Sequence, residues 1–395
     1  MKPARFEQNP HYLPPKQDEP PLHRAARLGD LESIRRLVNE GRDINLPFDI
    51  RLDPDGRMAL ATPLMVAAGS GDGASLETMR LLLELGANPL LRFGWGSIAR
   101  FAAGGLGWNY LPGGDGARLR LCLDLGCDAN ETDKRGVTLR ADATATGDVD
   151  RVKVLLEAGA KPNAADTVVP TSFPELPGSP FDDNAPVSFR IPLHNAVEVD
   201  AIEIVRLLIA AGADVHAVDR AGRTALFSAR SPGVARVLID AGLDIEAQDC
   251  LGWTPLVAAI NDGSLDGVKA FLSVGANVNA THDRGFTVFM SAVSSSERSL
   301  DIMDVLLEAG ANPSAVSELG WNAFHAAIDV NGPDANTEES VRSTFAFLAK
   351  LGVDINHKDN HGVSPLDRAK EYGTDIEVNA LLQFGAAGSS TGLRS

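Results

Sequence analysis

Cysteine is scarce in this chain, and the few cysteines are not spaced for metal binding. Three cysteines in 395 residues, with no Cys-x-x-Cys pair, are too few for a disulfide framework or a cysteine-rich zinc site. We therefore expect a reducing compartment, no metal and no cofactor.

Long apolar runs are also missing. No stretch approaches the 18 apolar residues that a membrane span needs, and residues 1–20 are polar and proline-rich where a secretion signal would be apolar. We expect a cytoplasmic protein that does not insert into membranes.

Basic residues are outnumbered, since the net charge is −17 and residues 121–395 hold 39 acidic but only 21 basic side chains. Such a surface repels nucleic acids and anionic membranes. Two interpretations remain open: the acidity attracts a basic protein partner, or it only keeps the chain in solution. Arg outnumbers Lys by 27 to 9, which is typical of GC-rich, bacterial genomes.

Nucleotide and hydrolase motifs are absent. The glycine-rich stretch AAGGLGWNYLPGGDGARL at 102–119 has no third glycine at dinucleotide spacing, and no Gly-Lys pair occurs anywhere in the chain. G-x-S-x-G and H-E-x-x-H are missing too. We expect no enzyme; the remaining alternative is an enzyme with a site in the 102–118 loop.

One octet recurs ten times, with apolar residues at its first, fourth and fifth places and glycine at its end. This is the stripe of an amphipathic helix followed by a glycine stop. The copies are IRRLVNEG, MRLLLELG, LRLCLDLG, VKVLLEAG, VRLLIAAG, ARVLIDAG, VKAFLSVG, MDVLLEAG, FAFLAKLG and VNALLQFG, with a basic spacing of 33 residues.

A second element precedes the octets and is clearest in GWTPLVAAI at 252–260. Thr254 can cap a helix and Pro255 suits its first position. Together with their relatives, such as IPLHNAV at 191–197 and GWNAFHAA at 320–327, these segments closely resemble the ankyrin-repeat family. The resemblance covers roughly residues 20–386. It implies an all-α repeat protein, a helix-turn-helix solenoid of about ten repeats with β-turn fingers and loop insertions.

The resemblance also divides the chain. Residues 1–20 form a proline-rich strap or a cap on the first repeat, 21–386 the solenoid, and 387–395 a disordered tail. Insertions are expected near 46–61, 103–118, 164–190 and 329–341, each too short to fold as a separate domain.

The histidines and cysteines have structural interpretations. His23, His194 and His325 stand at the histidine place of the first element, where the family uses the ring to hydrogen-bond neighbouring turns. Cys122 and Cys127 fall at packed places, whereas Cys250 lies on a fingertip.

Each finger of this family has a glycine in its turn, which we call the finger glycine. Recognition in the family is carried mainly by the two residues before this glycine and the one after it. Trp253, Phe286 and Trp321 follow successive finger glycines, so they are expected to form a stripe that either binds a partner or packs on neighbouring turns. Trp108 and Tyr110, in the long loop, either grip a partner or cover the groove. The candidate partner-binding residues are Trp95, Trp108, Tyr110, Arg220, Arg223, Cys250, Leu251, Trp253, Asp283, Arg284, Phe286, Glu318, Leu319 and Trp321.

These features predict a non-catalytic protein-protein interaction module that binds a protein partner through its concave finger and inner-helix surface and is monomeric before complex formation. An inhibitor or immunity protein for a toxin or enzyme is the first reading. A scaffold or effector that recruits a cellular or host protein is the alternative.

Overall fold

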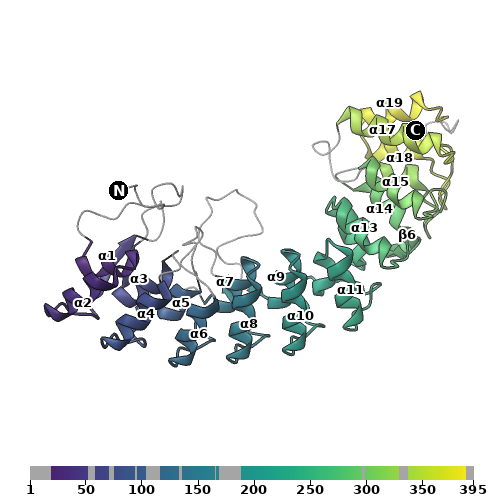
Figure 1. Cartoon of the computed structure of the whole chain (residues 1–395). Coiled ribbons are helices and arrows are strands. Elements are labelled where there is room, and N and C mark those ends of the chain that lie inside the picture. The colour runs from purple at the N-terminus through teal and green to yellow at the C-terminus, as the bar shows by residue number, and fades with distance from the viewer. Residues whose placement is uncertain are drawn as a thin grey trace. The chain divides into compact units, whose positions relative to one another are not determined.

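The computed structural model describes residues 19–51, 58–70, 75–93, 96–103, 116–132, 136–164, 166–168, 188–295, 299–328 and 337–387 (Figure 1). The chain divides into two compact units, Met1–Asp214 and Val215–Ser395. Residues 1–18 and 388–395, which hold almost all of the expected strap and tail, lie outside the described part.

Unit 1, Met1–Asp214, contains five helix pairs in its described residues. In each pair a first, inner helix is followed by a second, outer helix. The pairs are α1 (Pro21–Leu28) with α2 (Leu31–Asn39), α3 (Pro63–Gly69) with α4 (Ser75–Glu84), α5 (Ile98–Ala102) with α6 (Gly116–Asp124), α7 (Leu139–Ala145) with α8 (Val149–Glu157), and α9 (Pro192–Glu198) with α10 (Ile202–Ala210).

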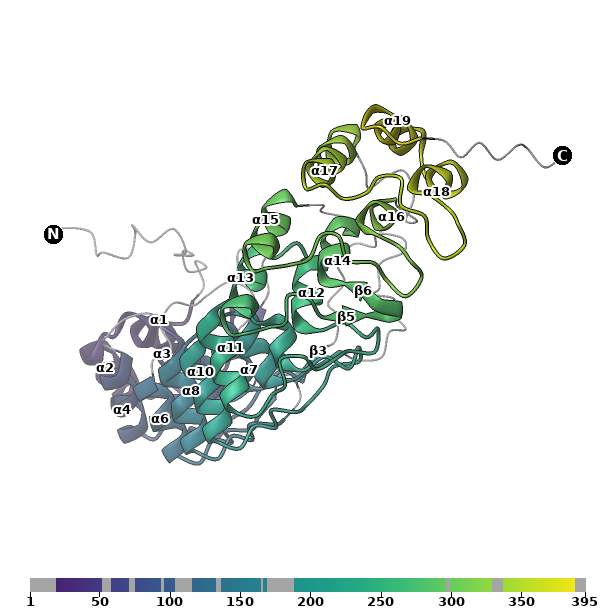
Figure 2. The same ribbon diagram turned by 90° about the vertical axis from the view of Figure 1, so that its right-hand side faces the viewer.

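Unit 2, Val215–Ser395, contains five more pairs in its described residues. Figure 2 shows its inner helices α12, α14 and α16 beside one another, with α13 and α15 in a second layer. The pairs are the 3₁₀ helix η2 (Ala225–Ser228) with α11 (Pro232–Asp240), α12 (Pro255–Asn261) with α13 (Leu265–Ser273), α14 (Val288–Ser294) with α15 (Leu300–Glu308), α16 (Ala323–Ala327) with α17 (Glu338–Lys350), and α18 (Pro365–Tyr372) with α19 (Asp375–Gln383).

The helices begin and end where the sequence signals stand. The Thr254 hydroxyl accepts the Val257 N–H at 3.4 Å and Pro255 is the first residue of α12. All ten octet glycines have φ between 76° and 104°, a conformation in which a side chain is strained. The two recurring elements therefore predicted both ends of the helix pairs.

The sixth repeat has a shorter first helix than the others. Its octet glycine, Gly242, follows Gly212 by 30 residues, three fewer than the basic spacing. The segment between the fingertip and Pro232 is long enough only for the single 3₁₀ turn of η2.

Each helix pair packs on the next pair within its unit, and the octet stripe forms the core between them. Inner helices contact inner helices, as in α1 with α3 or α12 with α14, and outer helices contact outer helices, as in α8 with α10 or α13 with α15. Leu208, the fourth residue of its octet, is completely buried, as the pattern predicted.

Asparagine side chains join consecutive repeats beyond the octet glycines. The Asn279 side-chain amide donates to the Gly310 carbonyl at 3.0 Å, and its oxygen accepts the Asn312 N–H at 2.9 Å. Asn130, Asn163 and Asn356 make the same two bonds to the repeats that follow them. We call this set the asparagine ladder.

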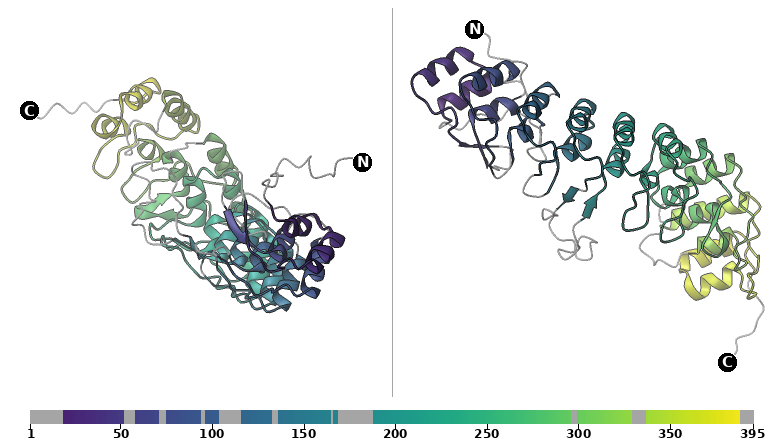
Figure 3. Two further views of the ribbon diagram at one scale, coloured as in Figure 1. Left: turned by 90° about the vertical axis from the view of Figure 1, so that its left-hand side faces the viewer. Right: turned by 90° about the horizontal axis from the view of Figure 1, so that it is seen from below.

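Two of the expected insertions carry short antiparallel hairpins. Strand β1 (Phe48–Arg51) pairs with β2 (Met58–Ala61), and β3 (Asp166–Val168) pairs with β4 (Ser188–Arg190). The right panel of Figure 3 shows β3 and β4 projecting from the row of helix pairs of unit 1. Most of the other two insertions, 104–115 and 329–336, lies outside the described residues.

Candidate functional site

The fingers of unit 2 are tight turns built on one plan. In the finger Asp249–Trp253, the Asp249 N–H donates to the Trp253 carbonyl at 2.9 Å. The Asp249 carboxylate accepts the N–H groups of Leu251 at 2.9 Å and Trp253 at 3.0 Å. Asp219 and Asp359 play the same part in their own fingers. These acidic residues therefore fix the turn and are not free for a partner.

Neighbouring fingers are joined through their backbones. In three pairs, the amide of the first tip residue donates to the carbonyl of the second tip residue of the preceding finger. These bonds run from Cys250 to Ala221 at 2.9 Å, from Glu318 to Arg284 at 2.9 Å and from Asn360 to Leu319 at 3.1 Å.

The finger glycine is required by this close approach as well as by its backbone conformation. Gly320 has a φ of 80°, and a Cβ atom added to it would lie 2.7 Å from the Asn360 nitrogen. Backbone hydrogen bonds of this kind thus join three of the four neighbouring finger pairs in unit 2, and the tip side chains are mounted on these turns.

The predicted contact residues of unit 2 differ in exposure. The tip residues are exposed: Arg220, Cys250, Leu251, Asp283, Arg284 and Glu318. Half-buried are Leu319 and the four residues that follow the finger glycines, Arg223, Trp253, Phe286 and Trp321. Trp95, Trp108 and Tyr110 lie outside the described residues. By position in the chain, Gly96 and not Trp95 is the equivalent of Trp253, because Gly96 directly precedes the capping residue Ser97 as Trp253 precedes Thr254.

Each half-buried aromatic ring has a neighbour. The Arg223 guanidinium lies 5.9 Å from the Trp253 ring centroid and forms an ion pair with buried Asp249 at 2.9 Å. Phe286 meets His282 edge-on at 5.6 Å. Each of these rings is therefore partly covered within the chain, and the part of each ring that remains exposed is what a partner can reach.

Trp321 has a partner that the sequence reading missed. Arg368, on α18, places its guanidinium 4.0 Å from the Trp321 ring centroid and 5.7 Å from that of Tyr372. The corresponding places of the three preceding repeats hold Ala258, Ser291 and Ala326. An alignment of the repeats therefore contained the signal, a large cation where small residues are usual.

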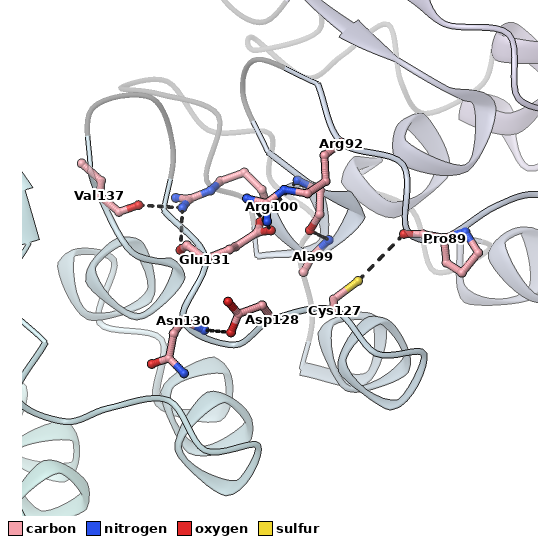
Figure 4. Close-up of polar contacts among 10 residues, drawn as sticks. Pro89, Arg92, Ala99, Arg100, Cys127, Asp128, Asn130, Glu131 and Val137 are labelled. Atoms are coloured by element: carbon pink, nitrogen blue, oxygen red, sulfur yellow. Dashed lines mark hydrogen bonds and ion pairs between the residues drawn. The ribbon is translucent and has the colours of Figure 1, made fainter.

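A second feature missed from the sequence is a buried arginine in unit 1. Arg100, on α5, has no exposed surface and stands at the histidine place of its repeat. Its Nη2 donates to the carbonyls of Val137 at 2.6 Å and Glu131 at 3.3 Å (Figure 4). Its Nη1 pairs with Asp142 on α7. Arg100 thus fastens its repeat to the next one.

Two of the histidines at this place, His23 and His325, bond the neighbouring turn as the family resemblance implied. His23 Nε2 lies 3.0 Å from the Ala61 carbonyl, and His325 Nε2 lies 3.1 Å from the Val363 carbonyl. Both carbonyls belong to the residue before the next helix cap, the position of Val137 opposite Arg100. Burial lowers the pKa of His23 and of His325, because it disfavours the charged ring.

The three cysteines differ in burial, and nothing in the described residues suggests a metal site. Cys122 is buried, Cys127 is half-buried and Cys250 is exposed. Burial raises the pKa of the Cys122 thiol well above its ordinary value, so this group is inert. Across the described ranges, no three His, Cys, Asp or Glu side chains are grouped so that they can hold a metal ion.

Comparisons with known proteins agree with this geometry. The family model for a single ankyrin repeat matches residues 17–47, 60–92 and 190–220, and the model for three ankyrin repeats matches 227–317. The chain belongs to the ankyrin-repeat family. Ankyrin repeats are generally non-catalytic modules of protein-protein interaction, and the fold is the all-α ankyrin solenoid.

Solved ankyrin domains resemble parts of the chain. An ankyrin repeat domain from Acinetobacter baumannii AYE is 29% identical over 50% of this chain and 98% of its own, with a TM-score of 0.39. The ankyrin repeat domain of Bcl-3, a member of the IkappaB protein family, is 27% identical over 63% of this chain and all of its own, with a TM-score of 0.45. No curated protein matches the chain. In the described part, none of the helices has the length and apolarity needed to cross a membrane.

Proposed function

We propose that this ankyrin-repeat protein is a non-catalytic inhibitor or immunity protein that binds one protein partner through the fingers of unit 2 and blocks it. The observation that carries the proposal is the finger edge itself. Two fingers, each hydrogen-bonded to another neighbouring finger, present exposed Cys250, Leu251 and Arg284 together with the half-buried rings of Trp253 and Phe286. Aromatic side chains with charged neighbours, held on a rigid support, are typical of binding hot spots.

The acidity of the chain fits a basic partner whose approach it would accelerate. Opposite charges steer association, and this effect weakens as salt rises. Recruitment of a cellular or host protein by the same surface is the alternative function, and the two differ in whether the bound partner keeps its activity.

The test is Trp253→Ala, measured on the complex with the partner isolated from the native cell. Loss of a hot-spot ring is expected to weaken the complex by roughly 30-fold through faster dissociation. Melting of the free protein should change little, because the ring is only half-buried. Val363→Ala, at the same place of the last finger, is the matched control and should leave affinity nearly unchanged.

Two results would contradict this assignment. One is an unchanged affinity of Trp253→Ala at a temperature where it is folded, which would make the ring structural. The other is a partner that keeps its full activity when saturated, which would favour recruitment over inhibition.

A further inference from the structure

We propose that Arg368, whose guanidinium lies beside the rings of Trp321 and Tyr372, is the site on unit 2 that recognises an aspartate or glutamate side chain of the bound protein. The inference rests on the proposed function, because it assumes that the partner is a protein bound at the finger edge. It names the chemistry that one part of that surface selects.

The position of Arg368 is set by its helix and by the preceding finger. Arg368 and Tyr372 are four residues apart on α18, so their side chains share one face of the helix. Trp321 follows the finger glycine Gly320, and its ring centroid lies 4.0 Å from the guanidinium. Two rings therefore restrict the arginine and leave the edge of its planar group to make hydrogen bonds.

This guanidinium lacks the acceptor that such a group normally has. Within the described part of the chain, no hydrogen bond or ion pair joins it to another residue, and its Nε is buried without a partner. An unpaired buried donor is costly, and a carboxylate can accept two of the donors of a guanidinium at once. A partner that supplies a carboxylate here would recover that cost on binding.

Arg223 offers an internal comparison. Its guanidinium also lies near two rings, Phe227 at 6.0 Å and Trp253 at 5.9 Å, but it forms an ion pair with buried Asp249. The same arrangement of cation and rings is thus completed within the chain at Arg223 and left incomplete at Arg368.

The carboxylates near Arg368 are engaged elsewhere. Asp359 accepts the N–H groups of His361 and Val363, both at 2.9 Å, and Glu377 accepts the Thr374 N–H at 2.8 Å in a helix cap. Glu371 is exposed and hydrogen-bonds Tyr372. These groups provide a negative surrounding that lets the guanidinium be half-buried, but none of them forms an ion pair with it.

The surrounding charge also limits the partner. With a net charge of −17, the chain repels strongly acidic molecules, so nucleic acids and polyacidic tails are disfavoured. A segment with one acidic residue among neutral or basic residues is not repelled by the acidic surface, and it still supplies the carboxylate that pairs with Arg368.

The experiment selects peptides from a random twelve-residue library displayed on phage, with the full-length chain as the target. Library peptides selected for binding to the wild-type chain should share one aspartate or glutamate. Peptides selected for binding to Arg368→Gln should not show that preference. For a selected peptide, anisotropy should show about 10-fold weaker binding to Arg368→Gln. The peptide with its acidic residue changed to the amide should bind both chains equally.

Controls separate recognition from folding. Arg342→Gln removes an exposed arginine of α17 that pairs with Glu338, and it should not change peptide binding. Arg368→Lys keeps the charge without the planar fork and should retain part of the affinity. If the Gln and Lys variants lose affinity to the same extent, and both also melt at a lower temperature than the wild type, the arginine acts in folding and the proposal is overturned.

Other outcomes also decide the matter. Selected peptides without a shared acidic residue, or acidic peptides that bind Arg368→Gln as tightly as wild type, would refute the carboxylate site. Competition by inorganic phosphate but not by acidic peptides would make it a phosphate site instead. If Trp253→Ala weakens the native complex while Arg368→Gln has no effect on peptide binding, this inference fails and the proposed function stands. If Arg368→Gln weakens peptide binding while Trp253→Ala leaves the native complex unchanged, the carboxylate site stands and the proposed function fails.

Discussion

Leu208 has no exposed surface although it lies on a helix of only nine residues, α10. Its neighbour Leu207 is half-buried, so two identical side chains on one helix differ only in their surroundings. At the residue scale, place within the octet decides what a side chain contributes.

Leu208→Ala should lower the free energy of unfolding by about 2–5 kcal/mol, because it removes buried methyl groups and leaves a cavity. Leu207→Ala makes the same chemical change at the half-buried place and should cost clearly less. Urea titration followed by circular dichroism measures both, and equal costs would contradict the packing described for α10.

We expect His325 to make unit 2 sensitive to acid. Its pKa lies below the ordinary 6.5, because burial disfavours the charged ring. The unfolded chain therefore takes up the proton first, so the stabilising effect is complete above pH 6.5 and is lost as the pH falls toward the lowered native value. In His325→Gln, stability should fall less steeply between pH 7 and 5, by at most about 1.4 kcal/mol per pH unit.

The wild-type chain provides the reference for this pH series. A His325→Gln chain that keeps the wild-type slope would show that this ring does not carry the effect.

At the element scale, the asparagine ladder sets how consecutive repeats are joined. Each rung uses one side chain to donate to the carbonyl of the next octet glycine and to accept the amide of the second residue after that glycine. Ser314 takes the place of a rung in the ninth repeat, and its side chain is too short for this reach. The ladder is therefore interrupted at Ser314. Removing the side chain of Asn279 can be compared with removing that of Ser314, at the equivalent place without the two bonds.

Asn279→Ala removes two hydrogen bonds between repeats and should cost about 1–2 kcal/mol of unfolding free energy. Ser314→Ala, at the equivalent place one repeat later, should stay within about 0.5 kcal/mol of wild type. Denaturant midpoints of the two variants compare them directly, and a neutral Asn279→Ala would remove the ladder from the account of stability.

The sequence predicted these elements well because their signals are local. Octet glycines, Thr-Pro starts and the 33-residue spacing act within one repeat, so they identified the helix pairs. Arg100 and Arg368 were not singled out, because their roles depend on groups from other repeats. Arg100 is bound by Glu131, Val137 and Asp142, and Arg368 is defined by Trp321, 47 residues earlier in the chain.

At the scale of the whole molecule, the division into Met1–Asp214 and Val215–Ser395 has a thermodynamic meaning. In a repeat protein each helix pair is stabilised mainly by its neighbours, so a run of several pairs has most of what it needs to fold.

A chain of residues 215–395 is therefore expected to fold alone, with a helical far-UV spectrum and a cooperative denaturant transition. A chain of residues 263–395 begins between α12 and α13 and leaves α13 without its inner helix, so it should be less helical per residue. A broad, non-cooperative transition for 215–395 would show that unit 2 depends on the rest of the chain.

The asparagine ladder also determines where the chain can grow. Asn130 reaches 31 residues ahead to Lys161, whereas Asn163 reaches 51 residues ahead to Asp214 and makes the same bond. The 20 additional residues (51 − 31) are accommodated between the rungs and leave the contact unchanged. Duplication of a complete repeat would lengthen the array of repeats, whereas an insertion within a repeat would only enlarge a loop. The number of repeats and the size of the loops can therefore evolve independently.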